Sequence, residues 1–179
     1  VAVERADGST EQVTGRYVIV AAGASPLVPP IDGLQAVDVL TNETLFELET
    51  QPERLAIVGA GPIGTEMAQA FARLGTEVVV LDMADRILSN DDAELAATLR
   101  ETLEGEGVEY VLGAQVEEVS QSGGTITISA GEYGAVEADA LLLATGRTAN
   151  VDGLNLDAAG IDYTRTGITV DDRCRTSQG

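Results

Sequence analysis

The middle of the chain combines uninterrupted apolar runs with a segment whose apolar residues recur at helical spacing. Residues 55–58 and 78–81 are continuous apolar runs, which are typical of strands buried on both faces of a parallel sheet. The segment between them ends at Gly75, a residue that favours helix termination. Its apolar positions share one helical stripe: Ile63, Met67, Ala70, Phe71 and Leu74. This pattern predicts a strand–helix–strand unit.

A second helix and a third parallel strand are predicted further along. Polar residues at 89–92 offer capping groups and place negative charge where a helix dipole favours it. Leu95, Leu99 and Leu103 predict the inner face of this helix. The run 108–112 then predicts the third strand of the parallel sheet.

After this strand the spacing changes from helical to alternating. Residues 116–119, 125–129 and 135–138 alternate and are separated by glycines, so they predict an antiparallel meander. The run 140–144 is apolar throughout and predicts a buried strand that returns to the parallel sheet. The expected fold class is therefore α/β, in three layers, with a parallel sheet and an antiparallel meander.

The two ends of the chain carry weaker patterns. Residues 1–24 are predicted to form short strands, one of them on the apolar run 17–20. Residues 41–48 predict a short helix that begins with a capping residue. The tail, 147–179, is polar and rich in loop residues, with one short strand predicted at 168–170.

Acidic side chains dominate the charge of the chain. The sequence has 30 Asp and Glu residues against 10 basic residues, all of them Arg, and a formal net charge of −20. Such a surface repels nucleic acid and anionic membranes, so neither is expected as a partner. Self-repulsion of this size is relieved by salt, which favours a salt-adapted protein; an ordinary acidic protein is the alternative.

Few side chains suit covalent or metal chemistry. Cys174 is the one cysteine and the sequence has no His. The chain therefore carries no internal disulfide, no His-based triad and no His-bound metal, and no metal site is expected. No apolar run approaches the roughly 20 residues of a membrane span. The N-terminal residues lack a signal-peptide pattern, so the expected location is cytoplasmic.

The turn after the first apolar run fits the dinucleotide-binding pattern G-x-G-x-x-G. Its context is the expected one, because a strand precedes it and a helix and a second strand follow. Gly59 would permit the tight turn, Gly61 would let a diphosphate approach the backbone, and Gly64 would let the helix pack closely. This predicts a Rossmann-like nucleotide site at the helix N-terminus, formed by Gly59, Ala60, Gly61, Pro62, Ile63 and Gly64.

Asp82 closes the second strand about 20 residues after the glycine turn, which is the spacing of the acid that binds the adenosine ribose. A carboxylate there accepts hydrogen bonds from the ribose hydroxyls and repels a 2′-phosphate. The prediction is therefore NAD, with NADP less favoured. Arg86 is nearby and could accommodate that phosphate, and Asp82 could simply cap a turn, so both alternatives stay open.

Several segments together resemble the flavin-dependent pyridine nucleotide–disulfide oxidoreductases, a family that includes dihydrolipoamide dehydrogenase, glutathione reductase and mercuric reductase. The resemblance covers nearly the whole chain and rests on residues 18–30, 55–66, 68–75, 141–150, 154–160 and 175–177. The segments 40–46 and 68–75 are closest to mercuric-reductase-like members, whereas Asp82 is closer to dihydrolipoamide dehydrogenase. Both branches remain open.

The resemblance implies a route for electrons from NADH to FAD, then to a pair of cysteines, and finally to a disulfide or metal-ion substrate. It also implies roles for residues outside the glycine turn. Glu66 would lie near the nicotinamide and the flavin, and Val116 and Gly146 would contact the nicotinamide nucleotide through their backbones. The loop that touches FAD would comprise Ala22, Gly23 and Ala24.

The resemblance further implies that much of the enzyme lies outside this chain. The FAD-binding glycine motif and the cysteine pair would precede Val1, and the dimerisation domain of a homodimeric parent would follow Gly179. Residues 1–34 would then be an FAD-domain segment with its crossover, 35–150 the NAD-binding Rossmann domain, and 151–179 a return to the FAD domain. The chain alone is expected to bind NAD without being catalytically complete.

Two other functions fit the same residues. One is an NADH oxidase or a ferredoxin-reductase-like flavoprotein without a redox disulfide. The other is a stand-alone NAD-binding module with no enzymatic activity. A cysteine pair upstream would favour the disulfide reductase over the oxidase, and a gene no longer than this chain would favour the module.

Overall fold

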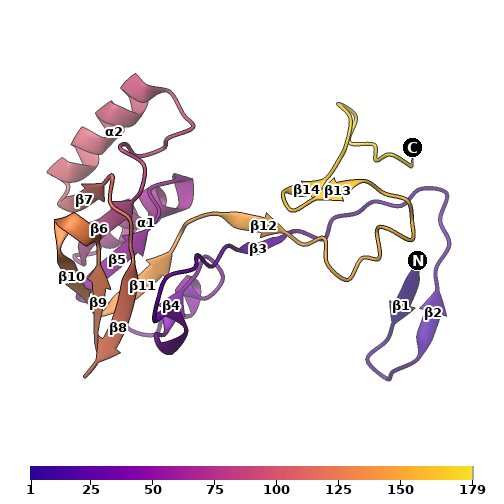
Figure 1. The fold of residues 1–179 in the computed structure, drawn as a ribbon, viewed down its shortest axis with the longest axis horizontal. Helices are drawn as coiled ribbons and strands as arrows, with labels where there is room; N and C mark the ends of the chain where they lie inside the picture. Colours follow the sequence, from indigo (N-terminus) through magenta and orange to yellow (C-terminus); the bar gives the residue numbers. More distant parts are fainter. Residues whose placement is uncertain (179) are drawn as a thin grey trace. The chain divides into compact units, whose positions relative to one another are not determined.

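The computed structural model describes residues 1–178 (Figure 1). Contacts divide them into two compact units. The larger unit is Ala24–Thr148, and the smaller one combines Val1–Gly23 with the segment that begins at Ala149. The glycine turn and Asp82 both belong to the larger unit.

The larger unit is built on a five-stranded sheet with the order β4-β11-β5-β6-β7 (Figure 1). Every neighbouring pair in it is parallel. The strands are β4 (Val39–Leu40), β5 (Arg54–Val58), β6 (Glu77–Asp82), β7 (Val108–Leu112) and β11 (Ala140–Leu143). Four of them confirm the strands predicted from the apolar runs.

Two helices cover one face of this sheet: α1 (Pro62–Arg73) and α2 (Ala93–Gly105). Leu55 and Ile57 of β5 point to this face and pack with Ala68 of α1 and Leu103 of α2. The predicted first helix is confirmed, and Gly75 follows its end with a φ of 96°. The stripe predicted for this helix is only partly right: Met67 and Phe71 pack partly buried against the core, but Ala70 is exposed and Leu74 is 66% exposed. The buried residues of α1 are Gly64, Thr65 and Ala68.

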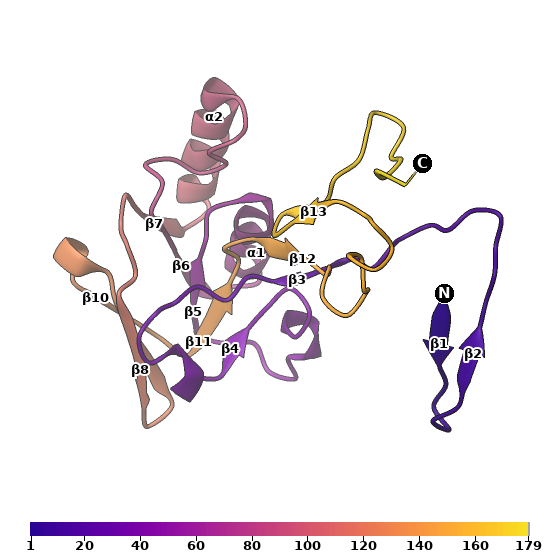
Figure 2. The ribbon, with the colours of Figure 1, turned by 45° about the vertical axis from the view of Figure 1, so that its right-hand side comes forward.

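An antiparallel meander covers the opposite face of the sheet (Figure 2). Its strands are β8 (Glu118–Ser122), β9 (Thr125–Ser129) and β10 (Ala135–Ala138), in the order β10-β9-β8. Ala56 and Val58 of β5 point to this face and share a core with Ile126 and Ile128 of β9. Successive side chains of β5 therefore point into two cores, one on each face of the sheet. The three-layer α/β prediction is confirmed.

The prediction of a helix at 41–48 is wrong, because only the 3-10 turn η2 (Leu45–Glu47) forms there. The Thr41 hydroxyl accepts hydrogen bonds from the backbone N–H groups of Glu43 and Thr44 and holds them in a turn. Leu45 is buried but Phe46 is 78% exposed, so no wider apolar face stabilises further helical turns. The other short 3-10 turns are η1 (Leu34–Ala36) and η3 (Gly131–Tyr133).

The inner face of α2 also differs from the prediction. Leu95 is 72% exposed, whereas Ala96 is buried and Leu99 and Leu103 pack toward the sheet. The helix begins at Ala93 after the Asp92 cap, so the stripe that meets the sheet runs through positions 96, 99 and 103. The helical spacing of the predicted stripe was right, but the stripe passes through Ala96 and not through Leu95.

The meander and the tail contain smaller shifts. The strand predicted at 116–119 begins two residues later, at Glu118 of β8. The strand predicted at 168–170 forms as β14 (Gly167–Ile168), paired antiparallel with β13 (Tyr163–Thr164). Strand ends are set by the partner strand, which a single segment does not reveal.

The smaller unit begins with an antiparallel hairpin of β1 (Ala2–Glu4) and β2 (Thr10–Gln12). The strand predicted at 17–20 does not form, and Tyr17, Val18 and Ile19 are 79%, 64% and 90% exposed. No neighbouring strand completes a ladder with them, which is why an apolar run alone did not become a strand. Where the chain passes between the units, β3 (Ala24–Pro26) pairs with β12 (Arg147–Ala149).

Within residues 1–178, no helix is long and apolar enough to cross a lipid bilayer. Cys174 is exposed and is not part of a disulfide.

Candidate functional site

The ends of four strands lie along the carboxyl edge of the parallel sheet. Residues 59–64 follow β5, Asp82 ends β6, residues 113–116 follow β7 and residues 144–146 follow β11. The chain passes from β5 to β6 and β7 on one side and later returns to β11 on the other. This change of direction is the topological switch point at which open α/β sheets bind ligands.

The glycine turn is shaped by close backbone contacts that exclude larger residues. Gly59 has a φ of 114°, and a Cβ on it would lie 2.4 Å from the Ala144 carbonyl oxygen. A Cβ on Gly64 would lie 1.9 Å from the Gly59 carbonyl oxygen. These two glycines therefore let β5, α1 and the end of β11 pack tightly. The structure agrees with the reason for which the pattern requires glycine at both positions.

Gly61 is a glycine for a different reason. A Cβ there would have nothing within 4 Å, and its φ of −74° suits any residue. The protein therefore does not require glycine at this position, and the open space beside the backbone is available to a ligand. This is the cradle that a diphosphate needs in order to approach the main chain.

The first turn of α1 has neither a side-chain cap nor an acidic residue of its own. Pro62 occupies this turn, and Gly61 is the N-cap residue. Backbone N–H groups and the helix dipole give this end a partial positive charge. In a chain with a net charge of −20, it is a local site suited to an anion.

Asp82 lies beside this turn and binds it. Its Oδ2 accepts a hydrogen bond from the Ala60 N–H at 2.5 Å, and its Oδ1 accepts one from the Ala84 N–H at 2.8 Å. The Ala60 carbonyl in turn accepts from the Leu88 N–H at 2.9 Å. Both polar backbone groups of Ala60 are thus held by residues in or after β6. Asp82 is half-buried, which leaves part of its carboxylate accessible.

Arg86 lies in the loop that joins β6 to α2. Its guanidinium donates hydrogen bonds to the carbonyl oxygens of Leu88, Ser89 and Asp91. The sequence marked Arg86 as a possible ligand of a 2′-phosphate, and the structure places its donors on the backbone of its own loop.

The residues assigned to the nicotinamide side lie on the same edge but differ in exposure. Glu66 is exposed on α1. Val116 is 8% exposed and packs in the core beneath the meander. Gly146 has a φ of 129°, and its carbonyl accepts a hydrogen bond from the Leu27 N–H at 2.9 Å. The segment before Val116 reaches β6 through a hydrogen bond from the Ala114 N–H to the Asp82 carbonyl at 2.9 Å.

The loop assigned to FAD contact is held by residues 147 and 150, which follow β11. The Asn150 side chain donates to the Ala22 carbonyl at 3.1 Å, and the Asn150 N–H donates to the Gly23 carbonyl at 3.0 Å. The Ala24 carbonyl accepts from the Arg147 guanidinium at 2.6 Å. Residues 22–24 and 147–150 therefore lie side by side.

Sequence reasoning missed two features of the carboxyl edge. Leu88, with a φ of 48°, holds the glycine turn through its backbone, and the Ala144 carbonyl forms the wall against which Gly59 packs. Both act through main-chain atoms, which no side-chain pattern can reveal. Among residues 1–178, no group of three or more acidic or Cys side chains is arranged to hold a metal ion.

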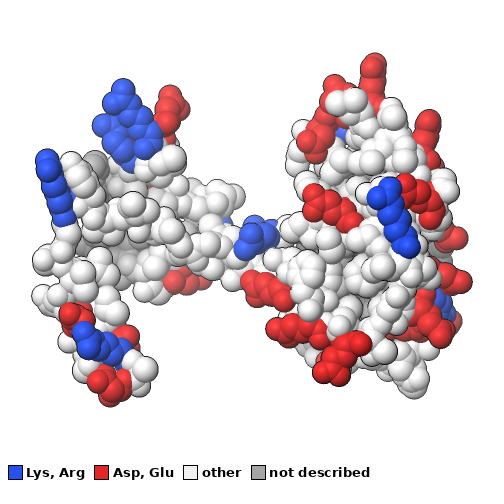
Figure 3. Space-filling view, turned by 180° about the vertical axis from the view of Figure 1, so that it is seen from behind, with Lys and Arg blue, Asp and Glu red and all other residues white. Residues whose placement is uncertain are grey.

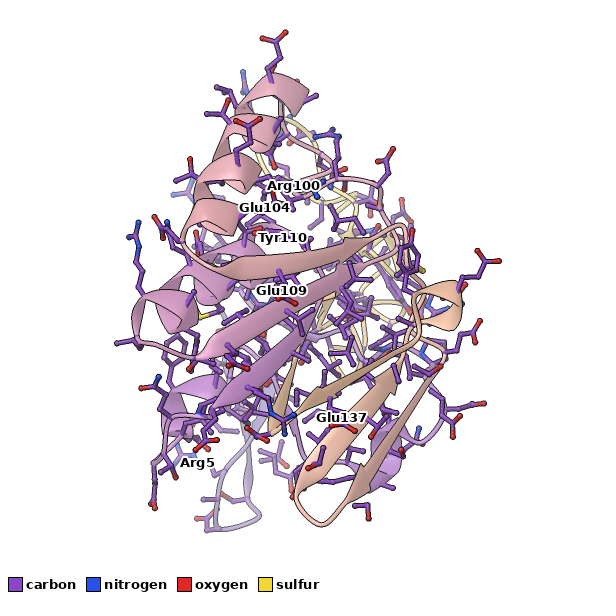
Figure 4. The ribbon with its side chains drawn as sticks, turned by 90° about the vertical axis from the view of Figure 1, so that its left-hand side faces the viewer. Arg5, Arg100, Glu104, Glu109, Tyr110 and Glu137 are labelled. Atoms are coloured by element: carbon purple, nitrogen blue, oxygen red, sulfur yellow. The ribbon has the colours of Figure 1, made fainter. Side chains whose placement is uncertain are left out.

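A cavity of about 420 Å³ lies at the opposite, amino end of the strands. Several valines line it together with Arg54, Glu77, Glu109 and Glu137. Figure 4 labels Glu109 and Glu137. Arg54 donates to Asp139 at 2.8 Å, and this hydrogen bond holds the pKa of the Asp139 carboxyl below its usual value. No feature of the sequence pointed to this cavity.

On the helix side, Tyr110 of β7 lies under α2 beside Arg100 and Glu104 (Figure 4). Arg100 lies 5.8 Å from the Tyr110 ring centroid and donates to Glu104 at 2.8 Å. Burial raises the pKa of the Tyr110 hydroxyl to about 12. Its hydroxyl oxygen is buried without a hydrogen-bond partner among the described residues.

Comparison with known proteins places this geometry in a family. The family model for pyridine nucleotide-disulphide oxidoreductase matches residues 1–179. A mercuric reductase from Lysinibacillus sphaericus is 39% identical over 96% of this chain and 33% of its own length. A dihydrolipoyl dehydrogenase from Pseudomonas aeruginosa is 36% identical over 99% of this chain and 38% of its own length. The chain thus spans about a third of the length of these relatives.

Solved structures agree with this result. A Cu(II) complex of the HOCl-induced flavoprotein disulfide reductase RclA from Escherichia coli matches with a TM-score of 0.89 and 31% identity, over 98% of this chain and 40% of that one. A water-forming NADH oxidase from Lactobacillus brevis, bound to NADH, matches with a TM-score of 0.82 and 26% identity, over 96% of this chain and 39% of that one. The chain belongs to the pyridine nucleotide–disulfide oxidoreductase family.

Proposed function

We propose that this chain is the NADH-binding part of a flavoprotein oxidoreductase that passes electrons from NADH to a disulfide or metal-ion substrate. The observation that carries the proposal is the open position at Gly61, on an uncapped helix N-terminus beside the Asp82 carboxylate. An anion-binding group and an acceptor of sugar hydroxyls lie next to each other there, as a dinucleotide requires.

The roles of the residues follow from their chemistry. The first-turn N–H groups of α1 would bind the diphosphate, and Asp82 would accept hydrogen bonds from the adenosine ribose. A 2′-phosphate would meet the negative charge of Asp82, which favours NADH over NADPH. Glu66 is exposed on α1 beyond the first turn and, by its place in the family, would lie near the nicotinamide. Val116 and Gly146 would border the same nucleotide.

The family implies a flavin as well as a pyridine nucleotide. Bound FAD would supply the acceptor for the hydride of NADH. In this chain residues 22–24 are the segment assigned to contact FAD, and hydrogen bonds from Asn150 and Arg147 hold their backbone. The other FAD contacts, the redox cysteines and a homodimer interface would belong to the rest of the polypeptide.

The test uses the full-length protein and the single substitution Gly61→Ala. Because a Cβ at Gly61 touches nothing in the protein, the variant is expected to unfold at the wild-type temperature. Its NADH dissociation constant, measured by calorimetry, is expected to rise at least about tenfold, since the Cβ occupies the space of the diphosphate. Gly105→Ala is the matched control, because its Cβ would also lie in open space but far from this edge. Unchanged NADH binding by Gly61→Ala would refute the proposal.

A second candidate function is favoured by the similarity to the water-forming NADH oxidase. The nucleotide site would be the same, and the electrons would pass to dioxygen without a redox disulfide. Steady-state assays of the full-length protein with lipoamide, mercuric ion or dioxygen as the acceptor separate the two. Oxidation of NADH that needs only dioxygen and gives water would favour the oxidase.

A further inference from the structure

The loop between β6 and α2 is fixed at three points that are close in sequence. Arg86 binds the carbonyl oxygens of three residues in the loop, at 3.1 Å for both Leu88 and Asp91. Ile87 is 1% exposed and packs in the helix-side core. Leu88 donates its N–H to the Ala60 carbonyl in the glycine turn. The guanidinium therefore closes a loop whose middle residues reach the core and the nucleotide-binding turn.

This loop occupies the adenosine side of the candidate site. It follows Asp82 directly, and Asp82 is the residue expected to bind the adenosine ribose. The Leu88 N–H and the Asp82 carboxylate hold the two polar backbone groups of Ala60. A change in the conformation of the loop would therefore shift the glycine turn as well as the residues expected beside the ribose.

The fork of Arg86 is unavailable to a phosphate in this arrangement. Nη1 donates to one carbonyl and Nη2 to two, so both N–H groups of Nη2 already have partners, and either bidentate geometry of a guanidinium would need one of them. The loop also carries Asp85 and Asp91 in addition to Asp82. A 2′-phosphate would have to break the fork apart and then lie among carboxylates.

We propose that Arg86 is a positioning residue that holds the adenosine wall of the nucleotide site in shape, and that it is not a ligand of a 2′-phosphate. The inference rests on the proposed NADH site. It predicts that loss of Arg86 weakens NADH and NADPH binding by the same factor and leaves the preference for NADH in place. A phosphate ligand in this position would behave differently, because its loss would weaken NADPH binding alone.

The experiment compares Arg86→Gln and Arg86→Lys in the full-length protein by calorimetry with NADH and with NADPH at fixed salt. Arg86→Gln is expected to raise both dissociation constants about tenfold, which corresponds to the loss of about one hydrogen bond from a charged donor. Arg86→Lys restores a charged donor without the fork and is expected to recover part of the affinity. The ratio of the two constants is expected to stay within about threefold of the wild-type ratio.

Amide hydrogen exchange supplies a readout that does not depend on nucleotide. The N–H groups of Leu88 and Asp91 are expected to exchange faster in Arg86→Gln, whereas those in β6 keep their wild-type rates. Arg73→Gln is the control, because it removes one positive charge and the contact with Glu106 at the far end of α1. It is expected to change neither the nucleotide affinities nor the exchange at Leu88.

Three results would overturn the inference: a selective loss of NADPH affinity, unchanged affinity for both nucleotides, or wild-type exchange at Leu88 and Asp91 in Arg86→Gln. If the wild-type protein bound neither nucleotide, the proposed function would fail. The exchange comparison would then still decide whether Arg86 holds the loop.

Discussion

The Asp82 carboxylate accepts a hydrogen bond from the Ala60 N–H at 2.5 Å, so the acid expected to bind the ribose also holds the glycine turn. One side chain thereby couples β6 to the turn after β5. The two functions use the same carboxylate group, and substitutions that keep an acceptor oxygen can separate them.

Asp82→Asn is expected to raise the NADH dissociation constant about 10- to 100-fold, because hydrogen bonds to a charged group contribute about 1.5–3 kcal/mol. Asn retains one acceptor oxygen, which can still serve the Ala60 N–H. Its unfolding temperature should therefore remain closer to that of the wild type than the unfolding temperature of Asp82→Ala. Calorimetry and thermal unfolding of both variants make the comparison. Wild-type NADH affinity in Asp82→Asn would contradict the role in ribose binding.

Gly64→Ala is expected to destabilise the fold by about 1–3 kcal/mol, because the added Cβ would lie 1.9 Å from the Gly59 carbonyl and the backbone must shift. Urea unfolding followed by circular dichroism measures the change. Gly61→Ala is the control within the same turn and should unfold like the wild type. Equal stability of the two alanine variants would show that α1 does not pack on the turn as described.

Tyr110→Phe is expected to stabilise the protein by about 1 kcal/mol, because it removes a buried hydroxyl that has no partner among the described residues. The Arg100 contact with the ring face is retained in Phe. Tyr133→Phe serves as control, since Tyr133 is 60% exposed and its hydroxyl can reach water. A clear loss of stability in Tyr110→Phe would mean that the hydroxyl has a partner in solution.

Asp139→Asn is expected to make stability less dependent on pH. The hydrogen bond from Arg54 lowers the pKa of Asp139 in the folded chain. A carboxyl with a lowered folded pKa stabilises the fold above its unfolded pKa, and this contribution disappears as the pH falls through the folded value. The variant should therefore be less stable than the wild type at pH 7 and nearly equal to it once Asp139 is protonated. Urea midpoints at neutral and acidic pH test this, with the exposed Asp38→Asn as control.

Salt is expected to stabilise this protein. Acidic side chains are spread over the visible surface of the unit Ala24–Thr148, where few basic side chains lie among them (Figure 3). Screening of this repulsion should raise the unfolding temperature between low and molar KCl. The same scan with sucrose, which does not screen charge, is the comparison. A melting temperature that does not change with KCl would remove the proposal of salt adaptation.

The parts of the fold that the sequence predicted well are those encoded by local pattern. The strands β5, β6, β7 and β11 are continuous apolar runs because both of their faces are covered, and α1 forms between Pro62 and Gly75 as expected, although Leu74 of its predicted stripe is exposed. The tight turn at Gly59 and the close packing at Gly64 also follow from the sequence, because each of these positions has its own steric requirement. These features need no knowledge of distant partners.

The errors occur where distant partners decide the outcome. Leu95 fits a helical stripe, but the contact of α2 with the sheet selected Ala96. The run 17–20 is apolar enough for a strand, yet no strand pairs with it. Arg86 was considered only as a possible phosphate ligand, whereas its partners in the structure are backbone carbonyls, and these have no signature in the side-chain pattern.

Asp82 pairs with Leu112 at the last position of the β6–β7 ladder, and this register fixes where the Asp82 side chain lies. Deleting one residue inside β6 would turn the Asp82 side chain to the opposite face and withdraw it by about 3.3 Å. Adding residues at the Gly123–Gly124 turn of the meander would leave that register untouched. Natural length variation should therefore accumulate in the meander turns, while the distance along the chain from Gly59 to Asp82 changes only within the loops that flank α1.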